Sequence, residues 1–270
     1  MHYHTIYIGV NFKTPEKAIE WVNSIHATNP KSLIVLVDNS SSHNQELYEK
    51  IKEKAVYIDS HENLGYFNGA AYGLHEIGKK HSFDWLAVTN VDLKLCTTNV
   101  DGLLDRYANA GIVAPSIISY DTGFDKNPYR LHRQSKKSVL IKKYAFSNRL
   151  FASIYSSLSA VRNYLIRINH KEGKKCDEGT AIYLPYGAAF FFSSKYFNTG
   201  CSIDFPLFLF GEELYVAEQA RRAGIDIVYV PSIIFMNYEH ASTSKLSSKS
   251  ICRRNYDAMK FILDEFYSKE

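Results

Sequence analysis

The sequence FDWLAVTNVDLKL, residues 83–95, gives the clearest indication of the fold. Its apolar run, Trp85–Val88, stops at a polar segment that ends in Asp92, which predicts a short buried strand with one carboxylate at its C-terminal end. Ligands of open α/β sheets bind at the carboxyl ends of the strands. A lone aspartate after a strand is also typical of a turn or a helix cap, so its meaning depends on the polar residues that follow other strands.

The segments on either side alternate between strand and helix patterns. Strands are predicted at Tyr3–Phe12, Leu33–Val37, Val56–Ile58 and Gly111–Ser119, within Ile182–Ser193, and at Ile225–Val230, which Pro231 closes. Helices are predicted from Pro15, after Asn44, from Phe67 or Asn68, at Val100–Tyr107, at Glu212–Ala223 and at about 250–267. We therefore expect an α/β fold, a mostly parallel sheet flanked by helices, in one domain of residues 1–270 with an insertion at about 121–180.

A polar cluster follows the second predicted strand. It consists of Asp38, Asn39 and Ser40, followed by two more serines. Carboxylate, amide and hydroxyl groups at a strand end suit the hydroxyls of a sugar or a nucleoside, because they both accept and donate hydrogen bonds. The alternative is that the cluster caps the helix that is predicted after Asn44.

A glycine-containing segment, His61–Gly73, follows the third predicted strand. Two of its glycines, Gly65 and Gly69, are four residues apart and would let the backbone approach a ligand, while the helix that starts near Phe67 would direct its dipole toward a phosphate. The segment lacks both the GxGxxG and the GxxxxGK[ST] pattern. Neither a dinucleotide-binding Rossmann site nor a P-loop is therefore indicated.

Two adjacent carboxylates, Glu212 and Glu213, open a predicted helix. The positive end of a helix dipole favours acids without any ligand; the functional alternative is a general base that takes a proton from an acceptor hydroxyl. Upstream, the small residues at 187–189 would leave space for a ligand. A single histidine, His240, precedes a Ser/Thr/Lys loop, and such a residue is more often structural than a metal ligand until a partner is known.

One segment holds the basic character of the chain. Between Lys126 and Lys175 there are thirteen lysines and arginines and one acid, although the net charge of the whole chain is +4. Apolar residues repeat there at helical spacing, at Leu150, Ile154, Leu158, Val161 and Leu165. A basic amphipathic helix with aromatic residues indicates contact of 126–175 with an anionic membrane surface; the alternative is a helical subdomain packed on the core. Without a reading motif, nucleic acid is not an expected partner.

Composition and length set the remaining limits. At 270 residues and 46% hydrophobic content, the chain can bury a large core. The four cysteines form no CxxC pair, which indicates a reducing compartment and no structural zinc site. No signal peptide is visible, and the longest apolar-rich stretch, Ala181–Phe192, is shorter than the roughly 18 residues that span a bilayer. We expect a cytoplasmic protein that can associate peripherally with the inner face of the plasma membrane.

Together these segments resemble the family-two glycosyltransferases, inverting enzymes with a GT-A fold, and especially the bacterial enzymes that build O-antigen (lipopolysaccharide) and capsule. The matching segments, in chain order, are Val37–Ser40, Asn63–Gly73, Asn90–Asp92, Gly187–Phe190, Glu212–Glu213 and His240. The resemblance covers nearly the whole chain apart from the insertion. It rests on the order and spacing of the segments, because no single one of them is decisive.

The resemblance implies a role for each segment. It implies donor-binding residues at Asp38, Ser40, Asn63, Gly65, Asn90 and Asp92, with Asp38 against the nucleotide base. Asp92 would bind Mg²⁺ or Mn²⁺, with His240 as a second ligand. Glu213 aligns with the catalytic acid of the family and is favoured over Glu212 as the base. Two positions depart from the family pattern, since Glu213 replaces an Asp and Asn90 replaces the first acid of the metal motif.

The expected activity is metal-dependent transfer of a hexosyl or deoxyhexosyl group from a nucleotide sugar to a glycan or lipid-linked glycan. One base region and no second nucleophile predict a single in-line displacement, which inverts the anomeric centre. One alternative is a non-catalytic sugar- or membrane-binding protein with the same fold. Another is a sugar-phosphate nucleotidyltransferase, which should have a glycine-rich basic loop where this chain has Asn11–Pro15.

Overall fold

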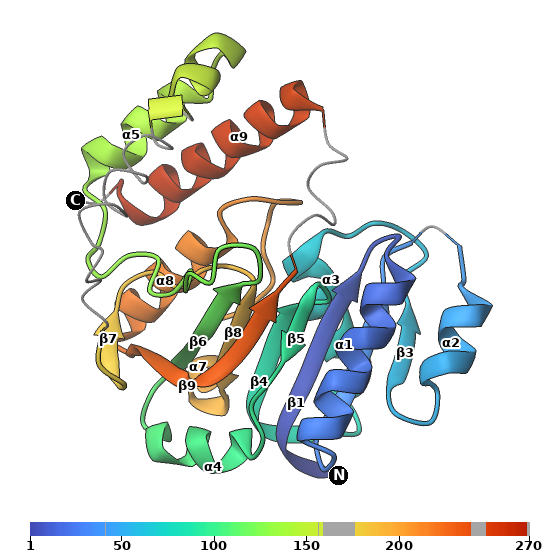
Figure 1. Ribbon diagram of the computed structural model, residues 1–270. Coiled ribbons are helices and arrows are strands. Elements are labelled where there is room, and N and C mark those ends of the chain that lie inside the picture. Colours follow the sequence, from blue (N-terminus) through green and yellow to red (C-terminus); the bar gives the residue numbers. More distant parts are fainter. Residues whose placement is uncertain (41, 156, 159–175, 239–246, 269–270) are drawn as a thin grey trace.

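The structure is a computed structural model that describes residues 1–40, 42–155, 157–158, 176–238 and 247–268. Among these residues, nine strands form one sheet (Figure 1). They are β1 His2–Asn11, β2 Leu33–Asp38, β3 Val56–Asp59, β4 Ser82–Asn90, β5 Leu93–Leu95, β6 Ile112–Ser119, β7 Thr180–Ile182, β8 Ala189–Ser193 and β9 Ile227–Asn237. Their order is β3-β2-β1-β4-β8-β6-β9-β5, and β7 pairs with β9.

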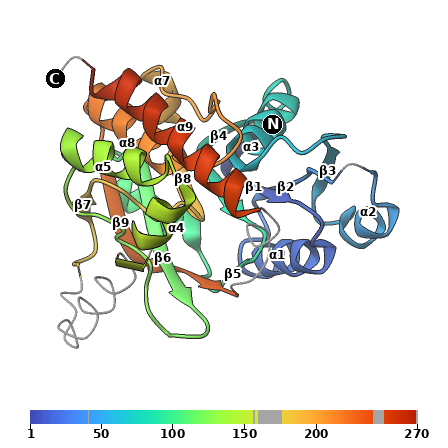
Figure 2. The same cartoon turned by 90° about the horizontal axis from the view of Figure 1, so that it is seen from above.

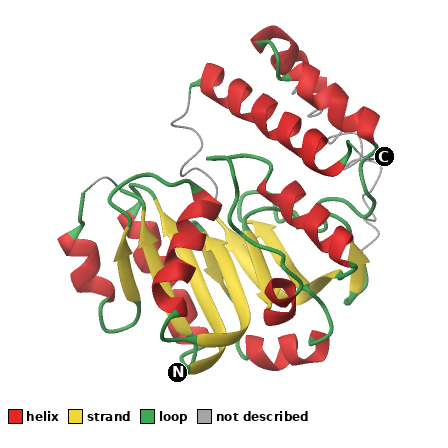
Figure 3. Cartoon of the chain, turned by 180° about the vertical axis from the view of Figure 1, so that it is seen from behind, coloured by secondary structure: helices red, strands yellow, loops and turns green. Residues whose placement is uncertain are grey.

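The direction of the strands places most carboxyl ends at one edge. Strands β1 to β4 are parallel to one another, and β6 is parallel to β9. Strand β8 lies between β4 and β6 and is antiparallel to both, so β6 and β9 point the same way as β1 to β4. The sheet is therefore mostly parallel, as the sequence predicts, and Figure 3 shows it with helices on either side.

Helices cover both faces of the sheet. They are α1 Pro15–Thr28, α2 Gln45–Ile51, α3 Tyr66–Gly78, α4 Val100–Leu104, α5 Lys136–Ala145, α7 Ser194–Asn198, α8 Glu212–Ala223 and α9 Ser248–Phe266. One buried cluster includes residues of α1, α2 and α4, and a second, on the other face, includes residues of α3, α7, α8 and α9. Figure 2 shows α9 crossing above the sheet.

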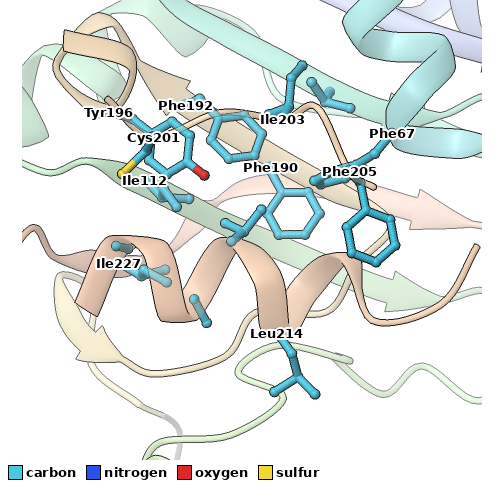
Figure 4. Close-up of a cluster of buried hydrophobic side chains, with 14 of the residues drawn as sticks. Phe67, Ile112, Phe190, Phe192, Tyr196, Cys201, Ile203, Phe205, Leu214 and Ile227 are labelled. Carbon is cyan, nitrogen blue, oxygen red and sulfur yellow. The ribbon is translucent and has the colours of Figure 1, made fainter. Parts of the chain in front are cut away.

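Strand β8 illustrates how both clusters form. Neighbouring side chains of a strand point to opposite faces, so Phe190 and Phe192 enter one cluster and Phe191 enters the other, all fully buried. Phe67 of α3 packs edge-on against Phe190, with ring centroids 5.5 Å apart. Figure 4 shows these rings beside Phe205, close to the start of α8.

Strand β9 continues through Pro231, so the prediction that this proline closes the strand is wrong. Val230 pairs with Pro115 of β6, and the next pair is Ile234 with Ser116, so β9 contains three additional residues at this point. Proline has no N–H group to donate to a ladder, and a bulge is a place where none is required.

The first part of the predicted insertion at 121–180 belongs to the sheet layer. The carboxylate of Asp125 accepts a hydrogen bond from the hydroxyl of Tyr229 on β9, at 2.6 Å. The side chain of Asn127 donates to the carbonyl of Pro115 on β6, at 2.8 Å. These two bonds hold the chain along the sheet before it reaches α5.

Helix α5 lies beside α9, above the carboxyl edge of the sheet (Figure 1). Residues 149–155 form a further helical stretch, and 159–175, which include the rest of the predicted basic helix, lie outside the described residues. Among the residues that the structure describes, no helix is both long and apolar enough to cross a membrane.

A buried carboxylate joins α8 to the segment before α5. Glu218 is fully buried and accepts hydrogen bonds from Nε of Arg133 (2.7 Å), Nε of Arg221 (2.8 Å) and the hydroxyl of Tyr183 (2.6 Å). Burial opposes the charge, but these donors outweigh it and hold the pKa of Glu218 below its ordinary value. Arg133 also donates to the carbonyl of Phe266, at the end of α9.

We expect Glu218→Gln to lower the free energy of unfolding by about 3 kcal/mol, the low end for breaking a buried ion pair, because both guanidinium groups keep some access to water. Urea unfolding measures this loss. The difference from wild type should be complete at neutral pH and should vanish as the pH falls through the depressed pKa of Glu218.

The matched control is Glu265→Gln, which removes an exposed carboxylate that pairs with Arg222 at 2.8 Å. Exposed pairs contribute about 1 kcal/mol or less, so this variant should unfold nearly as wild type does. Equal losses in the two variants would contradict a special role of Glu218.

Candidate active site

The carboxyl ends of four parallel strands lie side by side. Their last residues are Asn11 of β1, Asp38 of β2, Asp59 of β3 and Asn90 of β4. Asn11 lies opposite Asp38, which in turn lies opposite Asp59, and Asn90 lies opposite the residue before Asn11. Polar side chains that are far apart in the sequence therefore meet at one edge of the sheet.

The buried carboxylate of Asp38 accepts hydrogen bonds from three residues at this edge. It is fully buried, and its Oδ1 accepts hydrogen bonds from Nδ2 of Asn11 and the backbone N–H of Ser40, both at 3.0 Å. Its Oδ2 accepts one from the hydroxyl of Tyr57, at 2.9 Å. Helix α2 is capped by Asn44 instead. Contact of Asp38 with a nucleotide base stays a prediction, and it would require Tyr57 to move aside.

The loop before α3 is held by Asn39. Its side chain donates to the carbonyl of Gly65 at 2.8 Å, and the N–H of Gly65 donates to Oδ1 of Asn63 at 3.1 Å. Gly65 has a φ of +85°, and a Cβ there would lie 2.0 Å from the carbonyl oxygen of Phe208. The space beside this glycine is therefore occupied by the protein's own backbone.

Tyr66, the first residue of α3, contacts the chain just before β8 and is affected by the charges of three predicted acids. Its hydroxyl donates to the carbonyl of Ala188 at 3.2 Å. Burial, followed by the charges of Glu212, Asp92 and Glu213, raises the pKa of Tyr66 well above its ordinary value. The structure therefore brings the aspartate after β4 and the glutamates of α8 within electrostatic reach of one phenol.

Residues 187 and 188 connect the two sides of this region. The N–H of Asn90 donates to the carbonyl of Ala188 at 2.9 Å, next to the end of β4. A Cβ on Gly187 would lie 2.6 Å from Cγ and 2.7 Å from Oε1 of Glu213. The space that Gly187 leaves is thus filled by Glu213, and the expectation that it stays open for a ligand is wrong.

The loop that leads into α8 is held by both neighbouring helices. Asn68 of α3 accepts a hydrogen bond from the N–H of Phe205 (3.2 Å) and donates to the carbonyl of Leu207 (3.1 Å). The guanidinium of Arg254 on α9 lies over the ring of Phe208, 4.3 Å from its centroid. These contacts fix the position at which α8 begins.

The two glutamates at the start of α8 differ in their surroundings. Glu212 is 7% exposed, and burial, with the charge of Glu213, raises its pKa to about 8. Glu213 keeps part of its surface exposed; burial of its carboxyl group raises its pKa as well, and the positive charge of Lys142 on α5 opposes the rise. Two neighbouring acids with raised pKa values oppose each other's ionisation. Glu213 is the more exposed of the two and has the charge of Lys142 nearby, so it is the one placed to accept a proton from an acceptor hydroxyl.

The metal prediction concerns Asp92 and His240. Asp92 lies in the turn between β4 and β5, and its carbonyl accepts a hydrogen bond from the N–H of Tyr238, at 3.2 Å. His240, two residues further on, lies outside the described residues. Within the described ranges, no three His, Cys, Asp or Glu side chains are grouped to hold a metal ion. A single carboxylate still suits a hard cation whose shell is completed by phosphate oxygens and water.

Three residues of this edge have no predicted role from the sequence. Asn11 is the last residue of β1. Because ligands bind at the carboxyl ends of parallel strands, the end of this strand could have been identified as well. Tyr66 lies in the matching segment Asn63–Gly73, so the resemblance points to its position but gives it no role. Tyr57 has no comparable signal, because its hydroxyl comes from the middle of a strand.

The comparisons with known proteins concern the fold. No family model matches the sequence, and no curated protein matches it. Among solved structures, the chain is similar to the crystal structure of GalNAc-T7 with UDP, GalNAc and Mn²⁺, with a TM-score of 0.64 and 12% sequence identity. The match covers 98% of this chain and 49% of the other, so the chain spans about half the length of that protein. This likeness shows a GT-A glycosyltransferase fold and confirms the fold predicted from the sequence.

Proposed function

We propose that the protein is a glycosyltransferase that moves a hexosyl or deoxyhexosyl group from a nucleotide sugar to a hydroxyl of a glycan or lipid-linked glycan, with inversion. The observation on which this proposal rests is the junction at residues 187 and 188, at the carboxyl edge of the sheet. The carbonyl of Ala188 accepts hydrogen bonds from the N–H of Asn90 and the hydroxyl of Tyr66, and Gly187 lies against the side chain of Glu213. The similar crystal structure is one with UDP, GalNAc and Mn²⁺, which supports a nucleotide sugar and a divalent cation as ligands.

Glu213 acts as the base. Its carboxylate takes the proton of the acceptor hydroxyl as that oxygen bonds to the anomeric carbon, and the bond from this carbon to the diphosphate oxygen breaks with its electron pair on the diphosphate. A single displacement of this kind inverts the anomeric centre. Glu212 is buried, with 7% of its surface exposed, so it is poorly placed to attack the anomeric carbon in a two-step route through a covalent intermediate.

Asp92 would hold the divalent cation, Mg²⁺ or Mn²⁺, with His240 as a second ligand. When bound, such a cation balances the negative charge of the leaving diphosphate. On the donor side, Asp38 accepts hydrogen bonds from Asn11, Ser40 and Tyr57, which orders the end of β2; contact of Asp38 with the base would replace the bond from Tyr57.

We place this activity in the synthesis of a bacterial surface polysaccharide, O-antigen or capsule, in the cytoplasm at the inner face of the plasma membrane. The six matching sequence segments support this assignment. A non-catalytic sugar- or membrane-binding protein, or a sugar-phosphate nucleotidyltransferase, is the alternative. Donor turnover that disappears with EDTA distinguishes the enzyme from the binding protein, and the product separates the two enzyme classes.

Glu213→Gln should bind the donor as wild type does but lower transfer by a factor on the order of 10² or more, because the base is removed while its shape is kept. The donor is chosen by screening UDP-, GDP- and dTDP-sugars for thermal stabilisation of the protein in the presence of Mg²⁺ or Mn²⁺. Transfer is then followed by product chromatography.

Glu212→Gln is the matched control, since it alters the neighbouring residue of the same helix start. It should keep most of the activity. An inactive Glu212→Gln beside an active Glu213→Gln would assign the base to Glu212. A product that retains the anomeric configuration of the donor, determined by NMR, would contradict the single displacement.

Asp92→Asn should abolish metal-dependent donor hydrolysis and transfer, because the only protein carboxylate assigned to the cation is lost. Turnover is measured with Mg²⁺, with Mn²⁺ and with EDTA. Asp84→Asn is the control: Asp84 lies on β4, the strand that leads to the turn of Asp92, near the opposite end of that strand, and its side chain is half exposed. Wild-type turnover in Asp92→Asn would remove the metal assignment.

The rate of transfer should rise with pH, because the ionised form of the base is the active one. Burial raises the pKa of both glutamates, so the rise should occur at a pH well above the ordinary carboxyl pKa of about 4.3. In Glu212→Gln the rise should move to lower pH, since two neighbouring acids oppose each other's ionisation. The profile of kcat/KM between pH 4 and 10 measures both effects. A wild-type rise near pH 4 would show that the base is an ordinary exposed acid.

A further inference from the structure

Large exposed apolar side chains are concentrated in one part of the sequence, on α5 and on the residues that follow it as far as Leu158. Leu150 and Ile154 are four residues apart in a helical stretch, so they lie on one side of it. The described chain exposes thirteen large hydrophobic residues, and six of them lie within 18 residues of sequence. Their exposed fractions run from 49% to 65%. Single exposed apolar residues are ordinary, whereas a cluster marks an interaction surface. We call this cluster the docking face; it consists of Ile141, Tyr144, Leu150, Phe151, Ile154 and Leu158.

The charge around the docking face has one sign. Residues 136–158 contain five lysines and arginines and no aspartate or glutamate. A groove of about 700 Å³ between residues 146–149 and α9 adds Lys249 and Arg253 beside Arg149, with Asp257 as the acid on its wall. Exposed apolar side chains among basic residues match a bilayer with anionic headgroups, because the rings and aliphatic chains enter the acyl boundary while the cations meet the phosphates.

Helix α5 places this face close to the candidate base. Val139 and Lys142 are three residues apart and share one side of the helix; Val139 is fully buried, and the charge of Lys142 acts on Glu213. Ile141 and Tyr144 lie on the other side and are exposed. A surface in contact with them is therefore separated from the base by about one helix diameter, roughly 10–12 Å.

We propose that the docking face inserts into the headgroup region of an anionic membrane and that the enzyme takes a lipid-linked acceptor from that membrane. The attachment is peripheral, through the surface of α5 and residues 149–158. The choice of a lipid-linked acceptor rests on the proposed function, whereas membrane binding does not.

The test is co-sedimentation of the full-length protein with sucrose-loaded vesicles of phosphatidylcholine, with and without 30% phosphatidylglycerol. Wild type should bind the anionic vesicles and bind the neutral ones far more weakly, and 0.5 M NaCl should weaken the binding by screening. The double variant Ile141→Ser with Leu150→Ser should bind about tenfold or more weakly, since two apolar insertions are lost. Val56→Ser, at an exposed position on the edge strand β3, is the control and should bind as wild type does.

Hydrogen exchange of the wild-type protein is a second measurement, and its result does not depend on whether the variants fold. In wild type, anionic vesicles should slow exchange in 136–158 and leave β3 unchanged. Equal binding of the variant and wild type, no binding to anionic vesicles, or a dimer that the double variant dissociates would each overturn the proposal. Transfer to a soluble acceptor is assayed in parallel. Vesicle binding without any donor turnover would refute the proposed transferase activity and support membrane binding. Donor turnover without vesicle binding would support the transferase activity and refute membrane binding.

Discussion

The reversed direction of β8 is the constraint on which the candidate site depends. Because β8 is antiparallel to β4, its first residue, Ala189, lies beside Thr89, near the carboxyl end of β4. The two residues before it therefore emerge at the same edge as the ends of the parallel strands. A parallel β8 would start at the opposite edge, and the carbonyl of Ala188 could not accept hydrogen bonds from both Asn90 and Tyr66.

Helix α8 is positioned by contacts that do not involve its acidic start. Asn68 holds the preceding loop, and Glu218, in the second half of the helix, is held by Arg133 and Arg221. These contacts compensate for an unfavourable arrangement at the helix start, where two neighbouring carboxyl groups are partly or wholly buried and repel each other's charge. The position of Glu213 is therefore fixed by contacts elsewhere on α8 and its preceding loop. Acids with raised pKa values are often held in this way at functional sites.

Much of the fold follows from the sequence, because apolar runs of four or more residues between turn signals are local patterns. The features that could not be predicted depend on contacts with segments that are far away in the sequence. The three residues of β5 are too few to show a pattern, and the passage of β9 through Pro231 depends on a bulge opposite Pro115. At the site, strand ends identify Asp38 and Asp92, whereas the burial of Asp38 and the meeting of Asn90, Tyr66 and Glu213 at residues 187 and 188 are visible only in three dimensions.

The contact between Gly187 and Glu213 has an evolutionary consequence. The side chain of Glu213 occupies the volume that a side chain at position 187 would need, so the two positions are coupled. Alanine at 187 would require the carboxylate at 213 to turn away from its present position or to be shortened, and a shorter acid would leave space that a larger residue at 187 could fill. Epistasis of this kind makes the order of substitutions matter, and it predicts that the identities of these two residues covary among related chains.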